Sequence, residues 1–115
     1  MKKVVLFVGL IATLLVGLTS TRAAEVISAR QPIARVVIYT TYGSGDVVGT
    51  LVSGMPSGCF GFWLRPSDLG FKSAYADLIS SYHTNKSIIV GVENTSIWAG
   101  SANPYCRLVW IDHSP

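Results

Sequence analysis

The chain has 115 residues and a formal net charge of +3, with 50% hydrophobic and 13% charged residues. A chain of this length forms one small domain. Three of the nine basic residues, Lys2, Lys3 and Arg22, lie in the first 23 positions, and without them six basic residues face six acidic ones. This balance gives no compositional reason to expect binding to nucleic acid or to an anionic membrane surface.

Residues 1–23 have the layout of a secretory signal peptide. Lys2 and Lys3 form a basic head, and an apolar run extends from Val4 to about Leu18. Thr21 and Ala23 supply the small residues of a cleavage site, which is expected after Ala23. A membrane anchor is the alternative, but a spanning helix needs about 20 predominantly apolar residues. We therefore expect a bacterial export signal and a secreted or periplasmic domain, residues 24–115, with no membrane association after cleavage.

Two cysteines, Cys59 and Cys106, remain in the expected mature domain. An even number of cysteines in an exported protein favours a disulfide, and two cysteines allow one intrachain pairing. In the chain-entropy model a loop of this length contributes roughly 4 kcal/mol to stability. The alternative is a pair of buried free thiols or one reactive cysteine.

The first half of the mature chain predicts an irregular arm and three strands. Residues 24–32 show no clear period and are expected to form the arm. Residues 33–42 and 47–52 are rich in β-prone residues on either side of a short glycine-containing joint, which predicts a hairpin. A loop is expected at 53–58, followed by a short aromatic strand at 59–64.

A single helix is expected next. The residues Pro66-Ser67-Asp68 supply capping chemistry at its start, and Asn85 is expected to cap its end, near residues 83–84. Its apolar face, at helical spacing, comprises Phe71, Tyr75, Leu78, Ile79 and Tyr82, with Ala74 beside them. The opposite face carries Lys72, Ser73, Asp77, Ser80 and Ser81.

Two further strands are expected at 87–92 and 105–111, separated by a polar loop at 93–103 that contains Trp98. The element order is therefore β-β-β-α-β-β, mainly β with one helix. This is the order of the OB-fold, a small, partly open barrel. An open antiparallel sheet with the helix packed on one face is the alternative. In either case the disulfide would join the third strand to the last.

No catalytic, metal-binding or cofactor-binding motif stands out. The two histidines, His83 and His113, are expected at a helix end and in the C-terminal tail, with no Cys/His metal spacing and no nucleophile motif beside them. We therefore expect a protein that is not an enzyme and that uses no cofactor or metal.

Aromatic residues are the main indication of a binding site. Five of them are expected in the core, namely Phe60, Phe62, Phe71, Tyr75 and Trp110. Tyr39, Tyr42 and Trp98 lie beside turns, where flat rings with polar tips suit sugar rings or a protein partner. Arg35 and Tyr39 share one face of the first strand, which is outward if Val36 and Ile38 point inward. The predicted ligand-binding residues are Arg35, Tyr39, Tyr42 and Trp98.

Two stretches resemble the B subunits of the subtilase-cytotoxin and typhoid-toxin type. One is the spacing Phe71-x3-Tyr75-x6-Tyr82-x-Thr84-x-Lys86 followed by a β-branched strand and Trp98. The other is the run Val36-Val37-Ile38 leading into Tyr42-Gly43.

The resemblance implies a secreted OB-fold subunit in a ring of five, with helices lining a central channel and outer faces that bind host glycans. Family members carry a sialic-acid-binding serine ahead of the valine run, where this chain has Ile33-Ala34-Arg35. The arrangement of the paired cysteines also differs from that of the family.

Two functions follow as hypotheses. The first is a secreted, non-enzymatic binding module for a cell-surface glycan, similar to a toxin B subunit. The second is a periplasmic or extracellular accessory or structural domain that contacts another protein and binds no sugar.

Overall fold

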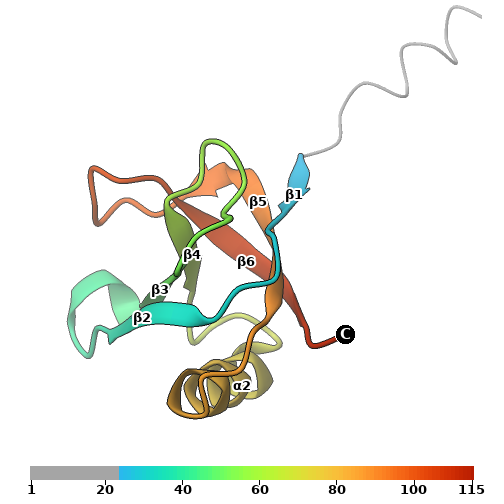
Figure 1. The fold of residues 1–115 in the computed structure, drawn as a ribbon. Helices are drawn as coiled ribbons and strands as arrows, with labels where there is room; N and C mark the ends of the chain where they lie inside the picture. Colours follow the sequence, from blue (N-terminus) through green and yellow to red (C-terminus); the bar gives the residue numbers. More distant parts are fainter. Residues whose placement is uncertain (1–23) are drawn as a thin grey trace, which may run out of the picture.

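The computed structural model of the chain describes residues 24–115 (Figure 1). The expected signal peptide and its cleavage site lie outside the described residues. The elements, in chain order, are β1 (Glu25–Ile27), β2 (Ile33–Ile38), β3 (Val47–Leu51), β4 (Gly61–Leu64), α2 (Phe71–His83), β5 (Ile89–Ile97) and β6 (Tyr105–Asp112). The prediction of a mainly β domain with its helix between the third and fourth expected strands is confirmed.

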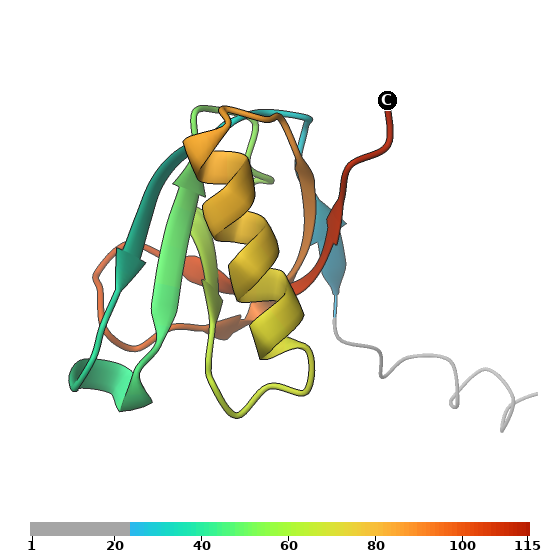
Figure 2. The same cartoon turned by 90° about the horizontal axis from the view of Figure 1, so that it is seen from below.

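The strands form one mixed sheet in the order β1-β5-β6-β4-β3-β2. Neighbouring strands are antiparallel except β4 and β6, which are parallel. The sheet is open, and α2 packs on one side of it, as both views show (Figures 1 and 2). This matches the predicted open sheet with one packed helix, although the sheet is not wholly antiparallel.

The two edges of the sheet are joined by residues 28–32. Along this short segment the backbone N–H of Gln31 donates to Ile88 O at 3.0 Å, on the β5 side. On the β3 side, the N–H of Val52 donates to Pro32 O at 3.0 Å. One continuous segment thus hydrogen-bonds to Ile88 beside β5 and to Val52 beside β3, an arrangement that is compatible with the small, partly open barrel.

Two segments that were expected to be irregular contain strand residues. The expected arm at 24–32 contains β1, which pairs with β5 and is further held by Trp110 Nε1, a donor to Glu25 Oε1 at 2.5 Å. The expected loop at 93–103 starts too early, because β5 continues to Ile97 opposite Cys106. Both segments gain their order from pairing with distant strands, which local composition does not reveal.

The helix runs from Phe71 to His83, and its buried face follows the prediction except near its C-terminal end. Leu78 is fully buried, and Phe71, Ala74 and Tyr75 pack against the core. Ser81 is buried, although it was expected on the solvent face, whereas Tyr82 is 41% exposed. Positions 71, 74, 78 and 81 lie along one stripe of a helix, so a small serine takes the place expected for the tyrosine.

The two helix ends differ in how well they were predicted. At the start, the N-cap residue is Gly70, and no side chain of residues 24–115 makes a capping hydrogen bond there, so the capping role expected of Pro66-Ser67-Asp68 is wrong. At the end, Asn85 has a positive φ of 54°, and Lys86 N donates to Ser81 O at 2.9 Å. This is the Schellman arrangement, and it confirms the role expected of Asn85.

The sheet buries side chains on both faces. The helix-facing core is built around the fully buried residues Phe62, Leu78, Ile88, Val90, Val92 and Cys106. A second cluster on the other face contains Val48, Trp63, Trp98 and Tyr105, with Val37 and Tyr39 packed against it. Neighbours such as Phe62 and Trp63 belong to different clusters because successive side chains of a strand point to opposite faces.

The expected disulfide is present between Cys59 and Cys106. Cys59 lies just before β4, because its N–H donates to Pro56 O in a turn and the strand begins only at Gly61. The bridge closes a loop with a sequence separation of 47. It is compatible with an extracellular or periplasmic location. Among residues 24–115, no helix has the length and apolar character needed to cross a membrane.

Candidate functional site

Five aromatic rings form a continuous row on the sheet face opposite α2. The row consists of Tyr42, Tyr39, Trp98, Tyr105 and Phe60, and we call it the aromatic row. The centroid distances between consecutive rings are 5.7, 5.4, 6.0 and 5.5 Å. Its two ends are exposed, at 56% for Tyr42 and 48% for Phe60, whereas Trp98 in the middle is only 4% exposed. The row therefore offers two accessible rings held by a buried centre.

Two loops bring the row together. The β2–β3 connection contains one turn of 3-10 helix, Tyr42–Ser44, and the β5–β6 connection begins at Trp98. Both views show these two connections on the same side of the sheet (Figures 1 and 2). Residues 43, 44 and 45 all have positive φ, the conformation that glycine adopts without strain. The glycine-containing joint is thus a hairpin turn, as expected.

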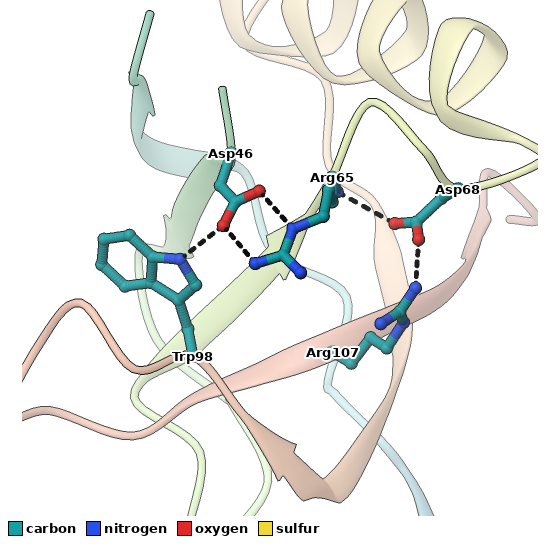
Figure 3. Close-up of polar contacts among 5 residues, drawn as sticks. All are labelled: Asp46, Arg65, Asp68, Trp98 and Arg107. Carbon is teal, nitrogen blue, oxygen red and sulfur yellow. Dashed lines mark hydrogen bonds and ion pairs between the residues drawn. The ribbon is translucent and has the colours of Figure 1, made fainter. Parts of the chain in front are cut away.

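Asp46 anchors this turn to the rest of the molecule (Figure 3). Its side chain is fully buried, and its Oδ1 accepts a hydrogen bond from Arg65 Nε at 2.8 Å. Its Oδ2 accepts from Arg65 Nη2 at 3.0 Å and from Trp98 Nε1 at 2.9 Å. Burial alone would raise the pKa of Asp46, but the hydrogen bonds from Arg65 and Trp98 outweigh burial and lower it below the usual value.

A second carboxylate extends the network (Figure 3). Asp68 Oδ2 accepts from the backbone N–H of Arg65 at 2.9 Å, and its Oδ1 forms an ion pair with Arg107. Asp68 therefore links Arg65, the residue that follows β4, to Arg107 on β6, and it does not cap the helix. Each arginine has its own carboxylate, so the network carries no net charge.

Trp63 contacts both arginines. The Arg65 and Arg107 guanidinium carbons lie 5.2 and 5.0 Å from its ring centroid, within the range of cation–π contact. Its Nε1 donates to Ser96 O at 3.0 Å. The two arginine side chains remain 39% and 36% exposed. They thus cover the indole and still present N–H donors to solvent beside the aromatic row.

Three of the four predicted site residues come together. Tyr39, Tyr42 and Trp98 contact one another in the aromatic row, with Trp98 as its buried centre. Arg35 lies on β2 opposite Thr50, is exposed, and belongs to neither of the two hydrophobic clusters. Ile38, expected to point inward, is 48% exposed, whereas Tyr39 packs against the second cluster.

The local sequence does not reveal several residues at this face. Asp46 read as an ordinary turn residue, and Phe60 was expected in the core, which is wrong because its ring lies at the exposed end of the row. Arg65 and Arg107 gave no local signal. Their partners lie 19 and 39 positions away in the chain, so only the tertiary structure reveals the network.

A groove of about 650 Å³ is lined in part by Arg107. It is bounded by the first turns of α2, the loop before it and the second half of β6. Among residues 24–115, no group of three or more His, Cys, Asp or Glu side chains is placed to hold a metal ion. The side chains at the aromatic row and along the groove offer hydrogen-bonding groups and apolar surface.

Comparisons with protein-family models, with curated proteins and with solved structures gave no significant match to this chain.

Proposed function

We propose that this chain is an exported, non-enzymatic binding module that holds a saccharide against the exposed ends of the aromatic row. The observation that carries the proposal is the row itself, a continuous series of tilted and edge-to-face rings with Tyr42 and Phe60 accessible and Trp98 fixed by Asp46. Rings held in this way present flat apolar faces at little entropic cost, and the tyrosine adds a polar tip.

The position of the row supports a saccharide ligand. In OB-fold barrels, oligosaccharides and oligonucleotides bind on the face of strands two and three and at the loops joining strands one and two and strands four and five. Here the corresponding strands are β3 and β4, which contribute Val48 and Trp63 to the second cluster. The corresponding loops are the β2–β3 turn and the β5–β6 loop, which carry Tyr42 and Trp98.

The charge of the face favours a saccharide over a nucleic acid. Arg65 and Arg107 are each paired with a carboxylate, so they offer N–H donors without the uncompensated positive charge that phosphate binding uses. Sugar hydroxyls need such donors and a flat apolar surface.

A glycan array probed with the oxidised protein tests the proposal. We expect binding that falls at least tenfold in Tyr42→Ala and several-fold in Phe60→Ala, because each variant removes one exposed ring. Tyr82→Ala is the matched control, since Tyr82 is an aromatic residue of α2 that is 41% exposed and lies on the side of the sheet opposite the row. Arg35→Ala shows whether the edge strand contributes. No glycan binding by a correctly folded protein would contradict the proposal.

Contact with a protein partner is the second candidate function. Exposed apolar rings at both ends of the row also suit a protein interface. A protein partner that competes at Tyr42 and Phe60, in the absence of glycan binding, would favour this function.

The ring of five implied by the toxin resemblance belongs to the same proposal. Light scattering of the secreted form gives its assembly state. A pentamer would support the B-subunit relationship, and a monomer would remove the ring while leaving the binding face to be tested as above.

A further inference from the structure

Within residues 24–115, the second half of β6 has one edge without a strand partner. The parallel pairing of β4 with β6 ends at Trp63 opposite Arg107, whereas β6 continues to Asp112. From Leu108 onward, β6 pairs only with β5 among the described residues. Its other edge therefore presents backbone N–H and C=O groups that an added strand can use.

The groove of about 650 Å³ follows this free edge. Four consecutive residues, Leu108 to Ile111, line it. A groove that runs along a strand edge contacts consecutive residues, because it meets their backbone as well as side chains of both faces. The pairing with β5 skips Val109, an extra residue whose side chain is 45% exposed.

The opposite wall is formed by the start of α2 and the loop before it. Phe71 and Ala74 give this wall an apolar surface, and Leu69 at its rim is fully exposed. Because the Leu69 side chain is exposed to solvent, it is free to pack against an apolar side chain of a ligand. With walls of this kind, the groove accepts a narrow, extended ligand of about four residues, at roughly 3.3 Å per residue of strand.

The charged groups of the groove favour a basic ligand. Two carboxylates, Asp68 and Asp77, line it together with one guanidinium, Arg107. Asp68 is paired with Arg107. Asp77 faces His113, whose Nε2 lies 2.8 and 2.7 Å from its two carboxylate oxygens. Asp77 therefore has no arginine or lysine partner among residues 24–115, and it lies at the end of the groove near the C-terminal tail.

We propose that this groove binds an extended peptide segment of a partner protein by strand addition to β6. The segment pairs its backbone with residues 108–111, places an apolar side chain against Leu69 and Phe71, and directs a lysine or arginine toward Asp77. Backbone pairing supplies the affinity in this mode of recognition, and the side-chain pockets supply the specificity. The site is separate from the exposed rings of the aromatic row.

Selection from a phage-displayed library of random heptapeptides on the immobilised oxidised protein tests this proposal. We expect selected peptides rich in β-branched residues with one lysine or arginine. A synthetic copy of the best peptide should shift the amide resonances of residues 108–111 in a ¹⁵N-labelled sample. Its affinity, measured by calorimetry, should fall about fivefold in Leu69→Ala and about fivefold in Asp77→Asn.

The controls separate this site from the aromatic row. Val52→Ala and Tyr42→Ala should bind the peptide with unchanged affinity. A library that yields no binder would overturn the proposal. So would peptides whose resonance shifts map to Tyr42 and Phe60, a saccharide that shifts the resonances of 108–111 in place of a peptide, or unchanged peptide affinity in both Leu69→Ala and Asp77→Asn. Failure of glycan binding at the aromatic row would leave these outcomes unaffected.

Discussion

Replacement of Asp46 by asparagine tests the buried network most directly. Asp46→Asn keeps the shape of the side chain but exchanges one acceptor oxygen for an NH₂ donor. The fully buried carboxylate accepts three hydrogen bonds, two from Arg65 and one from Trp98. The variant must lose at least one of them and place a donor against a donor, which destabilises a buried site.

The expected magnitude is about 2–3 kcal/mol. Hydrogen bonds to charged groups contribute about 1.5–3 kcal/mol, and removal of one partner of a buried ion pair costs about 3–5 kcal/mol. The lower part of these ranges applies because Arg65 is 39% exposed and water can replace a lost partner. For a domain of this size, each kcal/mol corresponds to a fall of about 4–8 °C in Tm.

The pH dependence gives the effect a signature. Because the pKa of Asp46 is lowered in the folded state, its contribution to stability is present above the unfolded-state pKa, about 3.9, and is lost as the pH falls through the folded-state value. We therefore expect the difference between wild type and Asp46→Asn to be complete at pH 7 and to shrink below about pH 4.

Urea unfolding followed by tryptophan fluorescence measures this difference. Asp77→Asn is the matched control, because the pair of Asp77 with His113 is partly exposed and should contribute less than about 1 kcal/mol. Equal unfolding midpoints for wild type and Asp46→Asn at pH 7 would refute the reasoning, as would a difference that persists undiminished at pH 2.

Three further predictions concern local features. Reduction of the disulfide, or the pair Cys59→Ala and Cys106→Ala, should lower the free energy of unfolding by roughly 4 kcal/mol in urea titrations, and a change below about 1 kcal/mol would contradict the loop-closure argument. Gly43→Ala should lower Tm by several degrees, because φ is 62° and the new Cβ would lie 3.0 Å from Asp46 Oδ2; calorimetry checks this, and an unchanged Tm would show that the turn relaxes freely. Asn85→Ala should cost about 1 kcal/mol and Asn85→Gly almost nothing, because residue 85 is left-handed, and equal losses in the two variants would be inconsistent with this.

The two surfaces of the molecule differ in how they are built. Asp46, Arg65 and Trp63 hold the buried centre of the aromatic row in place, which restricts the movement of its exposed rings. The groove along the second half of β6 instead presents a strand edge without a partner among residues 24–115, together with the exposed side chain of Leu69. Preorganised rings suit a weakly structured saccharide, whereas a free strand edge suits an extended peptide.

Local sequence by itself determined the helix, the hairpin, the disulfide and the class of the fold. The helix between Phe71 and His83 follows from apolar spacing, and Asn85 ends it by adopting a left-handed conformation. The pairing of Cys59 with Cys106 was the only intrachain choice. Such features depend on neighbours within a turn or on composition, so a single sequence contains them.

Only the tertiary structure decided the rest. Strand β1 and the extension of β5 to Ile97 exist because distant strands pair with them. Asp46 meets Trp98, 52 positions away, and Asp68 clamps Arg107 instead of capping the helix. A buried carboxylate is tolerated only where donors from several strands converge, and that convergence is a property of the folded sheet, not of any stretch of the chain.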